Sequence, residues 1–112
     1  MNTSIIGIGE IVITLPAEKT LALGDFVTIN DTGTAVKTAN EAEPVGVCVS
    51  RNGAYAGVQV KGGVRVPCTD STLKPGYQIL KVSDGKLAKG TAGTPHLVVS
   101  ADTALETAEV IL

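Results

Sequence analysis

The residues with the chemistry to catalyse a reaction or bind a metal are few and widely spaced. His96 is the only imidazole of the 112-residue chain, and Cys48 and Cys68 are its only thiols. A catalytic triad requires a base held beside a nucleophile, but His96 follows Thr94 and Pro95 at the start of an apolar segment. A zinc site requires three or four nitrogen or sulfur ligands, and these three residues lack that spacing. The sequence therefore predicts no catalytic, metal or cofactor-binding site.

The two cysteines are expected to be free thiols in a reducing compartment. Cys48 lies between Val47 and Val49, and Cys68 follows Pro67 at the end of a strand-like segment. The chain has no CxxC motif and is not a small, disulfide-dense scaffold. We interpret both cysteines as small buried residues, with a disulfide between them as the alternative.

Two other groups of residues are better explained without chemistry. Glu41 and Glu43 could form half of an acid–base pair, but they lie in a polar loop where solvated carboxylates are ordinary. The glycine-containing segments at 7–9 and 61–63 lack the spacing and the following helix of a phosphate-binding loop. Their glycines are expected to serve bends or bulges.

Composition and charge exclude two classes of partner. Nine Lys and Arg against eleven Asp and Glu give a net charge of −2, without a basic cluster to bind phosphates. Only three side chains are aromatic, which leaves little for stacking on bases. The first fifteen residues are apolar but lack basic residues and are interrupted by Gly7, Gly9 and Glu10. We therefore expect neither nucleic acid nor a membrane as a partner, and no signal peptide.

The elements that would position any site are short strands. Thirteen Gly and five Pro punctuate segments rich in Val and Thr, which favours strands over helices. Strands are expected at 11–15, 26–30, 45–50, 57–61, 63–67, 77–82, 97–100 and 108–112. The turn signal at Ser83, Asp84 and Gly85 predicts a hairpin, and 102–106 is the one candidate helical turn. These spacings predict an all-β fold, a small antiparallel β-barrel or sandwich, formed by a single domain at 10–112.

An internal repeat is visible at a spacing of 52 residues. Aligning 15–60 with 67–112 without gaps gives eight identities in 46 positions. The identical pairs are Thr20 and Thr72, Leu21 and Leu73, Gly24 and Gly76, Gly33 and Gly85, Lys37 and Lys89, Val47 and Val99, Ala56 and Ala108, and Val58 and Val110. Two such halves packed about a pseudo-twofold axis would share one core. The alternative is that hairpins rich in Val and Gly match one another without duplication.

Several segments carry a resemblance to a known family. They are 23–27 (LGDFV), 44–47 (PVGV), 57–61 (GVQVK), 63–67 (GVRVP) and 73–80 (LKPGYQIL). Together they resemble the small capsid cement, or head decoration, proteins of tailed bacteriophages, over roughly residues 10–112. In the second half, Leu97, Val98 and Val99 replace the Val-Gly-Val of the first half.

The resemblance implies a structural virion protein rather than an enzyme. It implies a compact β-barrel, synthesised in the host cytoplasm and bound to the outer surface of the capsid. The expected partner is the phage major capsid protein, whose subunit contacts the protein would stabilise. The expected oligomer is a homotrimer.

The first nine residues are expected to form an N-terminal arm that reaches a neighbouring subunit or the capsid. Ile5, Ile6 and Ile8 are its apolar side chains, and the glycines at 7 and 9 leave its backbone weakly constrained. The alternative is that this segment forms the first strand of the protein's own barrel.

A function of another class stays open. A small β carrier or ligand-binding module, appended to a larger complex, could have the same hairpins. Carrier domains modify a lysine at a hairpin tip framed by acidic or Met residues, and Lys86 follows Asp84 and Gly85 without that frame. An enzyme is the third hypothesis, and it lacks both a base and a nucleophile.

Overall fold

The computed structural model describes residues 8–112, and over this range the chain is entirely β. The ten strands are β1 (Ile11–Pro16), β2 (Phe26–Ile29), β3 (Ala35–Lys37), β4 (Gly46–Asn52), β5 (Tyr55–Lys61), β6 (Gly63–Pro67), β7 (Gly76–Ser83), β8 (Lys86–Lys89), β9 (Pro95–Asp102) and β10 (Thr107–Ile111). No helix long and apolar enough to cross a membrane occurs between residues 8 and 112.

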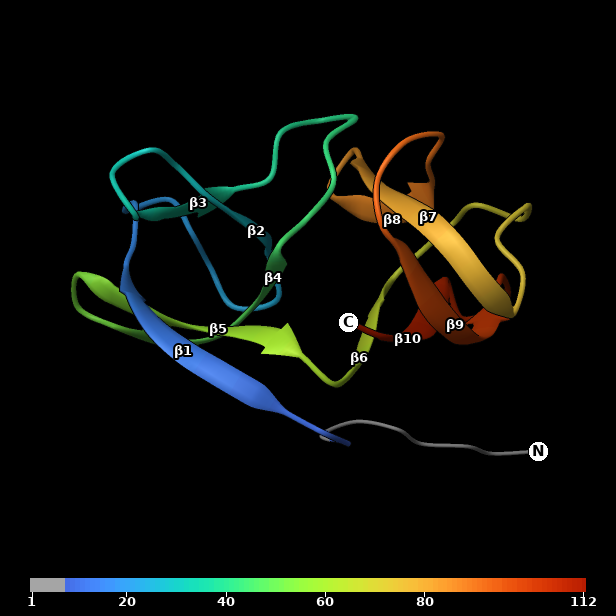
Figure 1. The fold of residues 1–112 in the computed structure, drawn as a ribbon, viewed down its shortest axis with the longest axis horizontal. Coiled ribbons are helices and arrows are strands. Elements are labelled where there is room, and N and C mark those ends of the chain that lie inside the picture. The colour runs from blue at the N-terminus through green and yellow to red at the C-terminus, as the bar shows by residue number, and fades with distance from the viewer. Residues whose placement is uncertain (1–7) are drawn as a thin grey trace.

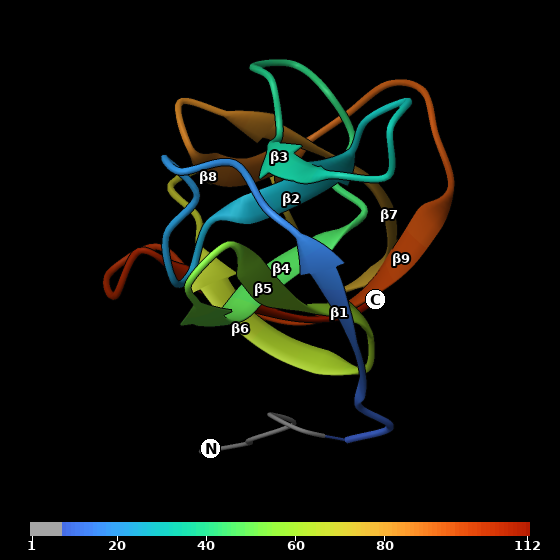
Figure 2. The same ribbon diagram turned by 90° about the vertical axis from the view of Figure 1, so that its left-hand side faces the viewer.

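The strands form two antiparallel five-stranded sheets that divide the chain in sequence. The first sheet has the order β1-β5-β4-β2-β3, and the second has the order β6-β10-β9-β7-β8. Figure 1 shows the first sheet on the left, in blue to green, and the second on the right, in yellow to red. Figure 2 views the molecule from the side of the first sheet, with β1 in front. Gly62 is the single residue between β5 and β6, and therefore between the sheets.

Local sequence explains the turns between the strands. Asp84 and Gly85 both have positive φ, 55° and 75°, and form the two-residue connection between β7 and β8. The predicted hairpin at this position is confirmed. The candidate helical turn at 102–106 is a turn that no helix continues, and in it the Asp102 carboxylate accepts the N–H groups of Ala104 and Leu105 at 3.0 and 3.1 Å.

The two sheets have corresponding strand orders, and each sheet contains the same kinds of local contact. The N–H of Lys37 donates to the Glu18 carboxylate at 2.9 Å, and the N–H of Lys89 donates to the Asp70 carboxylate at 3.0 Å. One isolated parallel bridge joins the edges of each sheet, Ala17 to Ala35 in the first and Cys68 to Leu87 in the second. These bridges are single contacts, so continuous strand pairing closes neither sheet into a barrel.

Two apolar clusters form the core, where the sequence led us to expect one. The first contains Leu21, Val27, Ala35, Cys48, Ala56 and Val58, all from the first half. The second contains ten residues of the second half together with Phe26 and Val47. The expectation of a single shared core is therefore wrong. Each sheet curves until its edge strands meet at the isolated bridge, and it encloses its own cluster. Phe26 and Val47 alone carry the first sheet into the second cluster.

The strand register places counterparts in the two sheets. Val47 pairs with Gln59 in the first sheet, and Leu97 pairs with Ile111 in the second. Val47 therefore corresponds to Leu97, and the gap-free match of Val47 with Val99 is wrong. The reason is a shorter connection before β9, which spans 90–94, whereas the connection before β4 spans 38–45.

Candidate functional site

The residues that could catalyse a reaction or bind a metal are dispersed over the fold, and each has a structural partner. Cys48 is buried in the first core cluster and Cys68 in the second, and both are free thiols, as predicted. Burial raises the pKa of each thiol above its ordinary value. Over residues 8–112, no three His, Cys, Asp or Glu side chains are grouped to hold a metal ion.

We expect both thiols to be almost unreactive in the folded protein. Burial limits access of a reagent, and the raised pKa keeps the thiolate fraction low near neutral pH. Titration with a chromogenic thiol reagent should therefore detect two thiols quickly in urea and only slowly in buffer. A thiol that reacts at the same rate in both conditions would contradict this burial.

The acidic loop before β4 joins the two sheets, although the sequence predicted solvated carboxylates. Glu41 forms an ion pair with Lys81, and its N–H donates to the Val82 carbonyl at 2.7 Å. A Glu43 carboxylate oxygen lies 3.7 Å from Nε2 of His96 and accepts the N–H of Thr94 at 3.2 Å. The sequence did not signal these partners, which are 40 to 53 positions away. His96 and Glu43 thus fasten the loop before β4 to the start of β9.

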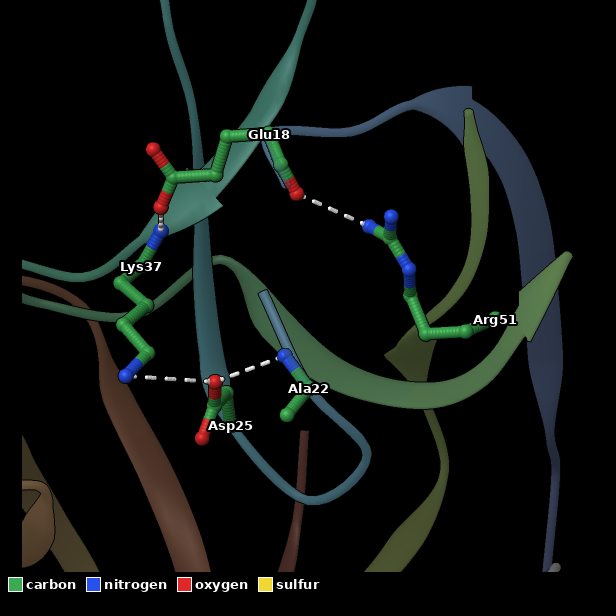
Figure 3. A network of polar contacts seen from close by, with 5 residues as sticks. All are labelled: Glu18, Ala22, Asp25, Lys37 and Arg51. Atoms are coloured by element: carbon green, nitrogen blue, oxygen red, sulfur yellow. Dashed lines mark hydrogen bonds and ion pairs between the residues drawn. The ribbon is translucent and has the colours of Figure 1, made fainter. Parts of the chain in front are cut away.

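A polar network fixes the corner of the first sheet where β1 ends (Figure 3). The Glu18 carboxylate accepts the N–H of Lys37, and its carbonyl accepts Arg51 Nη1 at 3.1 Å. Asp25 accepts the N–H of Ala22 at 2.9 Å and lies 3.7 Å from Nζ of Lys37. Each charge in this network therefore ties backbone or a neighbouring side chain, which is a structural role.

An open polar pocket of about 410 Å³ lies beside β7 and β8 in the second sheet. Lys81, Lys86 and Lys89 line it together with Asp70 and Asp84. Hydrogen bonds from the Thr72 hydroxyl and from the N–H groups of Lys89 and Thr72 lower the pKa of Asp70. Lys81 is paired with Glu41, and Asp70 accepts those three bonds, so both side chains have structural partners.

The remaining candidates are apolar surfaces. Ile5 and Ile6 of the predicted arm lie outside the described residues. The side chain of Ile8 is 54% exposed, while its carbonyl accepts the N–H of Gly63 at 2.9 Å. Ile11 and Val12 follow on β1, at the edge of the first sheet, and are 54% and 41% exposed.

A second apolar surface was missed in the sequence. Strand register places Tyr77 beside Leu97, and Leu97 beside Ile111, across β7, β9 and β10. We call these three residues the second row. Tyr77 is 75% exposed, and Leu97 and Ile111 are half-buried. The signal available in the sequence was a set of apolar residues at alternate positions to the core residues Val98 and Val110.

Comparisons of the chain with protein-family models, with curated proteins and with solved structures found no match.

Proposed function

We propose that this protein is a capsid cement, or head decoration, protein that binds the outer surface of a bacteriophage capsid. In that position it stabilises contacts between major capsid subunits, and it acts as a homotrimer. The role requires a rigid fold, an exterior that does not attract DNA, and adhesive apolar segments, but no catalysis. A net charge of −2 and the resemblance of residues 10–112 to this family support the proposal.

The observation that carries the proposal is the apolar edge formed by Ile8, Ile11 and Val12. Ile11 and Val12 lie on β1 at the edge of the first sheet, where a strand of a neighbour can add by backbone hydrogen bonds, and Ile8 lies in the turn before β1. Exposed apolar residues on an edge strand favour association, and soluble proteins normally protect such edges. On a shell, many weak contacts of this kind act together.

We also propose that the two sheets are pseudo-repeated halves, packed as a sandwich rather than closed as one barrel. Corresponding strand orders support the repeat. The equivalent bonds from Lys37 to Glu18 and from Lys89 to Asp70 support it further. Because a single bridge, and not continuous strand pairing, joins the edge strands of each sheet, the sandwich is favoured.

Replacing Ile8 and Ile11 together by serine should lower occupancy on phage heads while leaving the Tm of the free protein nearly unchanged. Both side chains are 54% exposed, so their loss costs the fold little but removes apolar area from the contact. Occupancy is measured by cryo-electron microscopy of heads incubated with the variant. Leu105→Ser is the matched control, because Leu105 is 72% exposed in the turn before β10.

Deleting residues 2–7 tests the arm and keeps the carbonyl of Ile8 that binds Gly63. Lower occupancy at an unchanged Tm is the expected result. A large fall in Tm would instead assign the segment to the protein's own core.

Absence of the protein from purified phage particles would refute the proposed function. A covalent group on Lys86, detected by mass spectrometry, would favour the carrier module.

A further inference from the structure

The two halves expose complementary apolar surfaces. A comparison of burial at corresponding positions of the two sheets identifies these surfaces. In the first sheet, Phe26 pairs with Val47, and Val47 pairs with Gln59, across β2, β4 and β5. We call these three residues the first row. By its pairing across β4 and β5, the first row corresponds to the second row, which crosses β9 and β10. By pairing with the edge strands β3 and β8, Ile29 corresponds to Val82, so β7 has two more residues than β2 between these positions.

The two rows differ sharply in burial. The first row is only 4–7% exposed, because Phe26 and Val47 pack in the second core cluster. The Gln59 side chain also donates from Nε2 to the Gly63 carbonyl at 3.2 Å. In the second row, Tyr77 is 75% exposed. One row is thus covered within the molecule, and its counterpart is not.

The inner sides of the sheets show the opposite difference. Val82 and Cys68 of the second sheet are each 2% exposed. Both residues pair with Leu87. In the first sheet, Ile29 and Ala17 pair in the same way with Ala35, and both are half-buried. The same holds on β1 and β6, where Ile13 and Leu15 are half-buried but Val64 and Val66 are buried. We call Ile13, Leu15, Ala17 and Ile29 the open side.

The packing of the first sheet on the second explains both differences. Phe26 and Val82 line one small cavity of about 70 Å³ between the sheets. The Val82 N–H also donates to the carbonyl of Ala42, at 2.9 Å. The first row and its neighbouring loop therefore cover the second sheet. The second row and the open side are only partly covered by the residues described, although Ile13, Leu15 and Ala17 pack against the first core cluster.

We propose that a second copy of this chain supplies that cover, with the second row of one molecule packed on the open side of the next. A second copy fits because the same pairing of surfaces already exists within the molecule. The contact is heterologous, since it joins different surfaces, and it generates a ring where the rotation closes. That the ring contains three copies rests on the proposed homotrimer. The contact between two copies does not depend on binding to a capsid.

The contact between molecules should be weaker than its counterpart within the chain. The loop at 38–45 adds two backbone hydrogen bonds to Val82, through Glu41 and Ala42. The corresponding connection at 90–94 is three residues shorter, so it offers fewer backbone groups for the same contact. In addition, association of separate molecules costs translational and rotational freedom. Self-association is therefore expected to depend on concentration.

Sedimentation equilibrium of the purified protein, without capsid, tests the proposal. The wild type should increase in mass with concentration. Tyr77→Lys should weaken association by at least about tenfold, as expected for loss of an aromatic anchor. Leu105→Lys is the matched control and should behave as the wild type, because this equally exposed residue lies outside the second row. A wild type that stays monomeric, or a Tyr77→Lys variant that associates normally, would overturn the proposal.

A mixing experiment tests the head-to-tail geometry. Ile29→Lys removes the open side, while Tyr77→Lys removes the second row. Each variant alone should be monomeric, but an equimolar mixture should form a dimer through the one intact pair of surfaces. A monomeric mixture would overturn the proposal. Circular dichroism confirms folding, and Ala17→Gln replaces Ile29→Lys if the latter does not melt cooperatively. Failure of the wild type to bind phage heads would refute only the capsid role.

Discussion

Replacing Phe26 by alanine is expected to destabilise the protein by about 3–5 kcal/mol, the usual range for truncating a buried aromatic residue. Phe26 is 5% exposed and is one of two residues that join the first sheet to the second core cluster. Its loss opens a cavity between the sheets and removes most of the apolar contact that couples them. Urea unfolding, followed by far-UV circular dichroism, measures the change in the free energy of unfolding.

Two substitutions give this prediction its controls. Phe26→Leu keeps most of the apolar volume and should cost less than half as much. Tyr77→Ala truncates the aromatic residue of the second row, which is 75% exposed, and should change the stability of the dilute protein little. Equal losses from Phe26→Ala and Tyr77→Ala would contradict the placement of the two sheets. Separate unfolding transitions in Phe26→Ala would support its coupling role.

The second large effect is expected at Gly62, where alanine should destabilise the protein by about 2–4 kcal/mol. Gly62 has a φ of +101°, a conformation that L-residues rarely adopt. A Cβ there would lie 2.6 Å from the carbonyl oxygen of Ile8 and 2.8 Å from the backbone of Glu10. Since these are backbone atoms, the segment from Ile8 to Glu10 must move, and the hydrogen bond from the Gly63 N–H to the Ile8 carbonyl would be lost.

Gly53→Ala separates crowding from backbone strain. Gly53 also has a positive φ, +60°, but beyond its chain neighbours no atom lies within 4 Å of the position that a Cβ would occupy. Its substitution should cost only about 1–2 kcal/mol, the usual penalty of a left-handed conformation. Thermal and urea unfolding of both variants provide the comparison. If Gly62→Ala costs no more than Gly53→Ala, the segment from Ile8 to Glu10 does not pack on the connection between the sheets.

The candidate surfaces were only partly accessible to sequence reasoning. The exposed side chain of Ile8 lies in the segment predicted to be adhesive. Glu41 and Glu43 were assigned to solvent because their sequence neighbours are polar, whereas Lys81 and His96 lie 40 and 53 positions away. An ion pair between distant residues leaves no local periodicity, so only the packing of the two sheets revealed it.

Local structure could be predicted from the sequence, since the alternation of Val58 and Val60 with polar or small residues specifies a strand, and Asp84 and Gly85 specify a hairpin. Such features depend on backbone conformation and on the two-residue period of a strand. Which of the two apolar rows is covered depends on how the two sheets pack together. Phe26 pairs with Val47 on β4, and Tyr77 pairs with Leu97 on β9. The placement of one sheet on the other buries Phe26 and leaves Tyr77 exposed, because burial depends on contacts distant in sequence.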